Sequence, residues 1–137
     1  MIKLSKLTDY SVVVLAEMAR GQGSLMTASG LAVQVGLPEP TVAKVLKLLA
    51  RGTVINSVRG ANGGYLLAKN PDEISIAAVI TAVEGPVVLT DCVGHSDHDC
   101  CTHAASCSVR GQWDPVNAAM RQALENVTLA QMMVKQA

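Results

Sequence analysis

The pattern that most constrains this chain is a pair of short amphipathic segments followed directly by an alternating β-hairpin. The first segment begins at Thr27 and ends at Gly36, and the second covers residues 41–51 after a tight connection at residues 37–40. The second segment carries one apolar stripe, which consists of Val42, Val45, Leu46 and Leu49. These features predict two helices joined at a glycine turn, with one face of the second helix buried and the other exposed.

The exposed face of the second predicted helix is basic. Lys44, Lys47 and Arg51 follow one another at steps of three and four residues, away from the apolar stripe. A helix pair with such a second helix is typical of a helix-turn-helix, in which the second helix enters the major groove of DNA. The alternative, for this segment alone, is an ordinary helical hairpin with solvated lysines.

The hairpin that follows favours the DNA-binding interpretation. Residues 54–59 alternate and are rich in β-branched side chains, residues 60–64 form a turn expected to need positive φ, and residues 65–68 form a second strand. A hairpin directly after a recognition helix is a wing, and Arg59 stands at its predicted tip, in reach of a minor groove. The residues expected to contact DNA are Thr41, Lys44, Lys47, Arg59, Gly60, Asn62 and Gly63.

The core of this chain must be aliphatic. Half of the 137 residues are hydrophobic, yet there is no Phe, one Trp and two Tyr. Helices packed on helices suit such a core better than an aromatic-rich β-sandwich does. Another helix is predicted over residues 10–20, with Thr8 as its cap and a stop at Gly21. The expected fold is mainly α with a small β wing, and residues 1–70 form a winged helix-turn-helix domain.

The formal net charge of zero conceals two halves of opposite sign. Residues 1–70 contain eight Lys or Arg and three Asp or Glu, whereas residues 71–137 contain three and eight. A basic half is expected where a protein binds a polyanion, here double-stranded DNA, although random charge drift is the alternative. The first apolar run, at residues 12–16, ends at Glu17 and is too short to span a membrane. A cytoplasmic protein without a membrane partner is therefore expected.

The second half of the chain divides into three predicted parts. A connecting helix is expected within residues 71–86, capped by Ser75, and residues 87–112 form a polar loop without periodicity. Residues 113–137 form a dimerisation helix and a capped final turn, with Asp114 as the N-cap and Pro115 as the first helical residue. Apolar residues recur along that helix every three or four positions from Trp113. This stripe favours a two-fold homodimer, and burial against the chain's own winged domain is the alternative.

All four cysteines lie in the loop, within sixteen residues, together with the only three histidines. In a reducing cytosol, such a group more often binds a metal or performs redox chemistry than forms structural disulfides. An iron–sulfur cluster, a zinc ion and a reversible thiol switch (Cys100 with Cys101, or Cys92 with Cys107) are the alternatives. The close cysteine pairs of many structural zinc sites are missing, and three loop aspartates oppose thiolate formation.

Several segments, in this order, resemble the winged-helix regulators that carry iron–sulfur clusters, of the IscR and NsrR type. The similar segments are KLSKLTDY at residues 3–10, LPEPTVAKVLKLL at residues 37–49 and SVRGANGGY at residues 57–65. The resemblance spans essentially the whole chain and includes the cysteines followed by Trp113 and a long helix. It is greatest to regulators of the SUF cluster-assembly operon. It implies a homodimeric repressor, not an enzyme, that binds a pseudo-palindromic operator and senses cluster status.

The same resemblance implies a set of cluster ligands. Cys92, Cys101 and Cys107 match the three cysteine ligands of the family, although the first interval is three residues longer than in the biogenesis regulator. Arg110 replaces that regulator's histidine ligand, and a guanidinium cannot bind iron. Asp9 of the other subunit, which matches the aspartate of nitric-oxide-sensing relatives, is therefore the expected fourth ligand. The fourth cysteine and the histidines are local competitors, and both 2Fe–2S and 4Fe–4S clusters are compatible.

The recognition helix departs from the biogenesis regulator at Ala43, where that regulator has a base-reading glutamate. The operator is expected to differ because an acceptor for a cytosine amino group is missing. Thr41 and Lys44 remain the candidates to reach base edges or flanking phosphates. The alternative functions are a nitric-oxide- or redox-sensing repressor of the same fold and a small metal or thiol redox protein.

Overall fold

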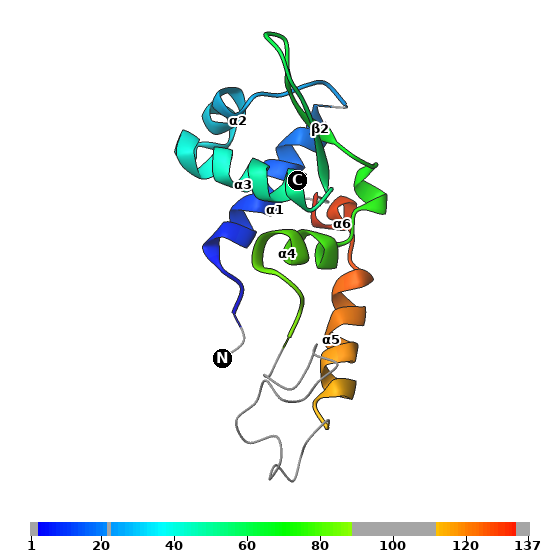
Figure 1. Ribbon diagram of the computed structural model, residues 1–137. Helices are drawn as coiled ribbons and strands as arrows, with labels where there is room; N and C mark the ends of the chain where they lie inside the picture. The colour runs from blue at the N-terminus through cyan, green and yellow to red at the C-terminus, as the bar shows by residue number, and fades with distance from the viewer. Residues whose placement is uncertain (1–2, 22, 89–111, 134–137) are drawn as a thin grey trace.

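The computed structural model describes residues 3–21, 23–88 and 112–133 (Figure 1). In chain order the elements are α1 (Lys6–Arg20), α2 (Ala28–Val35), α3 (Glu39–Arg51), β1 (Ile55–Val58), β2 (Gly64–Leu67), the short 3-10 helix η1 (Pro71–Glu73), α4 (Ile76–Glu84), α5 (Asp114–Glu125) and α6 (Leu129–Met133). The described part of the chain is thus mainly helical with one two-stranded antiparallel sheet, as the sequence predicts. None of its helices is long and apolar enough to cross a membrane.

Helix α1 begins earlier than its sequence predicts. Ser5 is the N-cap, and its hydroxyl oxygen accepts from the Thr8 amide at 3.3 Å. The expected cap at Thr8 is wrong, because Thr8 lies inside the first helical turn with its side chain buried. The stop at Gly21 is confirmed.

Helices α2 and α3 form the predicted pair. Thr27 caps α2 by accepting from the Gly30 amide at 3.0 Å, and Gly36 ends it in the left-handed conformation, with φ of 73°. Helix α3 begins at Glu39, two residues before the predicted start. The first turn of a helix tolerates proline because its amide groups have no partner within the helix, so Pro40 does not delay the start.

A single hydrophobic core joins the two halves of the chain. Its buried residues come from α1, α2, α3 and β1, and also from the second half, where Ile74, Val79 and Leu129 belong to the same cluster. Leu129, on α6, is fully buried, and α6 packs against α1 and η1. The core of the winged domain therefore continues past residue 70 and includes Leu129 of α6.

Helix α5 projects from one end of this core, opposite the hairpin (Figure 1). It lies against α4, and its N-cap is Trp113, so the expected cap at Asp114 is wrong by one residue. After α5, the Val127 carbonyl accepts from the Ile76 amide at 2.9 Å, and the Leu129 amide donates to the Ile74 carbonyl at 2.8 Å. These two bonds hold α6 beside the start of α4.

The two remaining predicted helix starts are confirmed. Ser75 caps α4 by accepting from the Ala78 amide at 3.1 Å. Thr128 caps the final turn through a reciprocal pair: its hydroxyl accepts from the Gln131 amide at 3.2 Å, and its own amide donates to the Gln131 side chain at 2.9 Å.

Candidate nucleic-acid interface

Helix α3 has one buried and one exposed face. The predicted apolar stripe is fully buried in the core, where it consists of Val42, Val45, Leu46 and Leu49. Lys44, Lys47 and Arg51 are exposed, and Thr41 near the helix start is half-buried. The exposed face also contains Ala43, whose methyl group cannot accept a hydrogen bond from a base. The structure thus brings the predicted α3 residues to the surface as one basic row.

The wing closes through a five-residue connection from Arg59 to Gly63. Strand β1 pairs with β2 in a register that places Val58 opposite Gly64, and the Gly63 amide donates to the Gly60 carbonyl at 3.0 Å. Arg59, Gly60 and Asn62 are exposed, so the predicted wing residues stand at its tip.

The glycines of the connection have different physical roles. Only Gly60 has positive φ, of 116°, so the expectation that the whole turn needs positive φ is wrong for Gly63 and Gly64. A Cβ at Gly63 would lie 2.1 Å from the Val58 carbonyl oxygen, and one at Gly64 would lie 2.8 Å from the Met26 carbonyl oxygen. Close backbone approach, rather than φ, excludes larger residues there.

Strand β2 of the wing is attached to the start of α2 through Tyr65. The Tyr65 amide donates to the Met26 carbonyl at 2.8 Å, and the Met26 amide donates to the Tyr65 carbonyl at 3.0 Å. Met26 immediately precedes Thr27, the N-cap of α2. An open groove lies between the wing and this helix start, lined in part by Thr27, Arg59 and Gly60. Sequence reasoning missed this attachment, because a single bridging residue leaves no periodic pattern.

The basic side chains of α3 and the wing form no ion pair with acidic side chains in the described part of the chain. Across residues 3–21, 23–88 and 112–133, the one ion pair joins Arg20 to Glu17 at 2.8 Å. The cations of Lys44, Lys47 and Arg59 are therefore available to an outside anion. Phosphate groups of a DNA backbone are anions of the kind that exposed Lys and Arg bind.

The expected cluster ligands are only partly described. Cys92, Cys101 and Cys107 lie outside the described residues, as do the remaining cysteine and the histidines. Asp9 is described, and its side chain is exposed on the first turn of α1. In the described part of the chain, no three His, Cys, Asp or Glu side chains gather into a metal-binding group. The described residues thus fit a cluster in one respect: Asp9 can supply a single oxygen ligand to a site otherwise made by cysteines.

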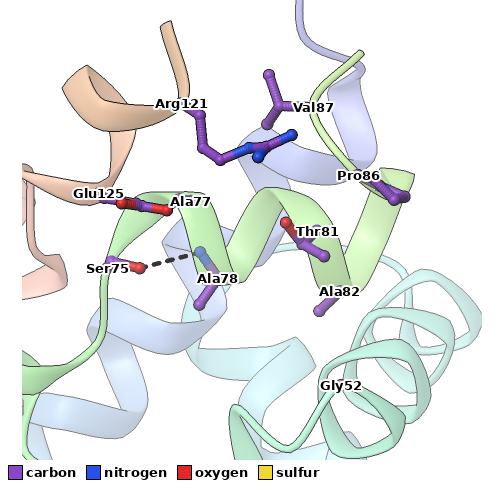
Figure 2. Close-up of a pocket in the computed structure, with 10 residues that line it drawn as sticks. All are labelled: Gly52, Ser75, Ala77, Ala78, Thr81, Ala82, Pro86, Val87, Arg121 and Glu125. Carbon is purple, nitrogen blue, oxygen red and sulfur yellow. Dashed lines mark hydrogen bonds between the residues drawn. The ribbon is translucent and has the colours of Figure 1, made fainter. Parts of the chain in front are cut away.

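A second concave surface lies between α4 and α5 (Figure 2). Small side chains, including Ala77, Ala78 and Ala82, form most of it. Arg121 extends over α4 toward Thr81 and Val87, whereas Glu125 lies beside Ser75 and Ala77 (Figure 2). Because its two charged groups point to different places, this groove does not have the convergent polar groups of a catalytic site.

The features of α3 and the wing together define a winged helix-turn-helix protein of the DNA-binding class. Comparison with known proteins identifies the family within this class. Residues 4–135 match the Rrf2 family, described as iron-dependent transcriptional regulators, and the chain belongs to this family. Its named relatives are transcriptional regulators.

Named relatives agree with the resemblance seen in the sequence. The chain is 28% identical to the transcriptional regulator IscR of Sodalis glossinidius over 134 residues, which cover 96% of this chain and 79% of that protein. It is 28% identical to the regulator NsrR of Halalkalibacterium halodurans over 136 residues, which cover 98% and 92%. The solved structure of CymR, the global cysteine regulator of B. subtilis, superposes with a TM-score of 0.69 at 25% identity and 97% coverage of both chains.

Proposed function

We propose that this chain is a homodimeric repressor that senses iron–sulfur cluster status and controls SUF cluster-assembly genes. One observation supports the DNA-binding part above all: the fully buried stripe of α3 directs an unpaired basic row outward, next to a wing with Arg59 at its tip. In this proposal α3 enters a major groove, and Arg59 reaches the adjoining minor groove. The glycines of the wing, including Gly60 and Gly63, allow its backbone to approach phosphates closely, and Asn62 contacts DNA beside them.

Within α3, the proposed roles follow from position. Thr41, at the helix start, and Lys44 reach base edges or flanking phosphates, and Lys47 binds phosphate. Because Ala43 offers no acceptor, the proposed operator lacks the cytosine contact that a glutamate at this position would make.

The proposed dimer uses the apolar stripe at the start of α5. Trp113 is 42% exposed and Val116 is 44% exposed, whereas Met120 and Leu124 on the same predicted stripe are half-buried. The stripe is therefore exposed at the start of α5 and half-buried further along the helix. The exposed part supports contact with a second copy around a two-fold axis, which suits a pseudo-palindromic operator.

The proposed sensor is a cluster bound by Cys92, Cys101 and Cys107, with Asp9 of the other subunit as the fourth ligand. When bound, the cluster supplies a centre that reacts with oxidants and nitric oxide. An oxygen ligand among thiolates makes such a centre labile, which suits a sensor. The exposure of Asp9 supports its availability to a second chain, and similarity to NsrR makes nitric-oxide sensing the second candidate function.

Anaerobic reconstitution of the full chain with iron and sulfide tests this proposal. Wild type is expected to gain visible absorption and to change its affinity for DNA from the SUF promoter. Asp9→Ala is expected to lose its cluster faster or to assemble an altered one, as measured by Mössbauer spectroscopy and native mass spectrometry. The matched control is Asp72→Ala, which removes an exposed carboxylate from η1. Absence of any chromophore, with DNA binding unaffected by iron, would refute the sensor and leave the DNA-binding proposal standing.

A further inference from the structure

The exposed face of α3 changes its chemistry along the helix. Its cations begin with Lys44 and continue to the last turn. The first turn exposes Pro40 instead, and Ala43 is exposed three residues later. Residues three apart on a helix are neighbours on one face, so the Pro40 ring and the Ala43 methyl group form one small surface, which we call the apolar patch. It lies at the end of α3 that helix-turn-helix docking brings to base edges.

The packing of α3 fixes the direction in which the apolar patch points. Val42, Val45 and Leu46, which precede and follow Ala43 in the chain, are fully buried in the core. A rotation of the helix that withdrew Ala43 from the surface would expose these side chains to water, which is unfavourable. Proline and alanine also lose no side-chain conformational entropy when they are buried. The apolar patch is therefore a preorganised part of the recognition surface.

The chemistry of the apolar patch selects among the four bases. Neither of its side chains can donate or accept a hydrogen bond. In the major groove every base presents hydrogen-bonding groups, and thymine alone adds a methyl group. Against a hydrogen-bonding edge, the apolar patch would displace water without replacing its hydrogen bonds, which weakens binding. Against the thymine methyl group, it removes apolar surface of both partners from water, which strengthens binding.

The charged neighbours of the apolar patch suit a T·A pair. Lys44 is exposed and has no acidic partner in the described part of the chain, so it is available to a backbone phosphate beside the base. Glu39, the first residue of α3, is exposed as well. Its carboxylate would repel a phosphate but can accept from an amino group, and adenine, the partner of thymine, presents one in the major groove.

We propose that Pro40 and Ala43 read the 5-methyl group of a thymine in each half-site of the operator. This inference rests on the proposed function, in which a dimer presents α3 to two half-sites. It names the base that occupies the position where the cytosine contact is missing at Ala43.

Uracil is the probe for this contact, because it differs from thymine only by the methyl group. The full chain first selects an operator from a pool of random duplexes, a step that does not depend on the target genes. Each thymine is then replaced by deoxyuridine, one position in one half-site at a time, and affinity is measured by fluorescence anisotropy. At one thymine per half-site, loss of the methyl group is expected to weaken wild-type binding about fourfold.

Three variants of the full chain assign the effect to the apolar patch. In Ala43→Gly the preference for thymine over uracil is expected to fall below about twofold, because only the Pro40 side of the contact remains. Ala50→Gly is the matched control, since Ala50 lies on the same helix but packs against the core, and it is expected to keep the wild-type preference. Ala43→Glu is expected to favour cytosine at that position, because a carboxylate accepts from the cytosine amino group.

The outcomes also identify which idea fails. A selection that enriches no sequence would refute the DNA-binding proposal and, with it, this inference. An enriched operator whose affinity is unchanged by uracil at every position would overturn the thymine contact and leave DNA binding standing. A preference for thymine that persists unchanged in Ala43→Gly would assign the methyl group to another side chain and overturn the role of the apolar patch.

Discussion

Leu129→Ala tests whether the C-terminal turn and the winged domain form one cooperative unit. Leu129 lies on α6, is fully buried, and belongs to the same hydrophobic cluster as Val14 and Leu46. Its amide bond to the Ile74 carbonyl, at 2.8 Å, does not depend on the side chain. The substitution therefore removes packing and leaves the backbone connection intact.

The expected cost follows from the number of atoms removed. Leucine exceeds alanine by three carbon atoms, whose transfer from water contributes about 2.4 kcal/mol at roughly 0.8 kcal/mol each. Because Leu129 is fully buried, the substitution also leaves a cavity, which adds to the transfer free energy. Together the two contributions lower the free energy of unfolding by about 3–4 kcal/mol. For a chain of this size, that corresponds to a melting temperature lower by about 10 °C. Met132→Ala, on the same helix at a site 53% exposed, is expected to cost less than about 1 kcal/mol.

Urea denaturation at one fixed protein concentration measures this loss, because dimerisation would otherwise change the midpoint. Far-ultraviolet circular dichroism follows all helices, and fluorescence of Trp113, the only tryptophan, follows the start of α5. In Leu129→Ala both signals are expected to shift together. If the fluorescence transition moved while the circular dichroism transition stayed at the wild-type midpoint, the single-core interpretation would be refuted.

Two further predictions concern the wing. Arg59→Ala is expected to weaken operator binding and to reduce the slope of log K against log salt concentration by about one per subunit. The control, Arg121→Ala on α5, should change neither the affinity nor the slope. Equal slopes for the two variants would contradict a DNA contact by Arg59. Gly63→Ala places a Cβ 2.1 Å from the Val58 carbonyl oxygen, so the connection must open. Operator affinity is then expected to fall at least tenfold with unchanged helix content, measured by fluorescence anisotropy and circular dichroism, and an unaltered affinity would show that the wing tip does not contact DNA.

Much of the local structure was predictable because it depends on neighbouring residues. Thr27, Gly36 and Ser75 begin or end helices through bonds that span three or four residues, and the wing follows from alternation around a glycine-rich turn. The basic row of α3 was predictable for a related reason. Once a helix buries one stripe of residues, the residues on its opposite face must point outward.

The errors arose where a distant segment decides between local alternatives. Thr8 is a good cap by residue type, but Ser5 takes that position and Thr8 is buried against Glu84 from α4. Gly63 and Gly64 resemble residues of a positive-φ turn, but carbonyl oxygens of Val58 and Met26 exclude side chains there. Each of these constraints comes from a neighbour in space that no periodic pattern reveals.

The sequence by itself determined the order of elements, the buried face of α3, the position of Arg59 in the wing and the family to which the chain belongs. These depend on periodicity, turn chemistry and short motifs, all of which act over a few residues. Only the tertiary structure decided that Leu129 completes the core of the winged domain, that α5 leaves Trp113 and Val116 exposed, and that Glu84 binds the first turn of α1. The physical reason is that burial and hydrogen bonding between distant segments depend on how helices pack, and many packings are compatible with the same amphipathic pattern.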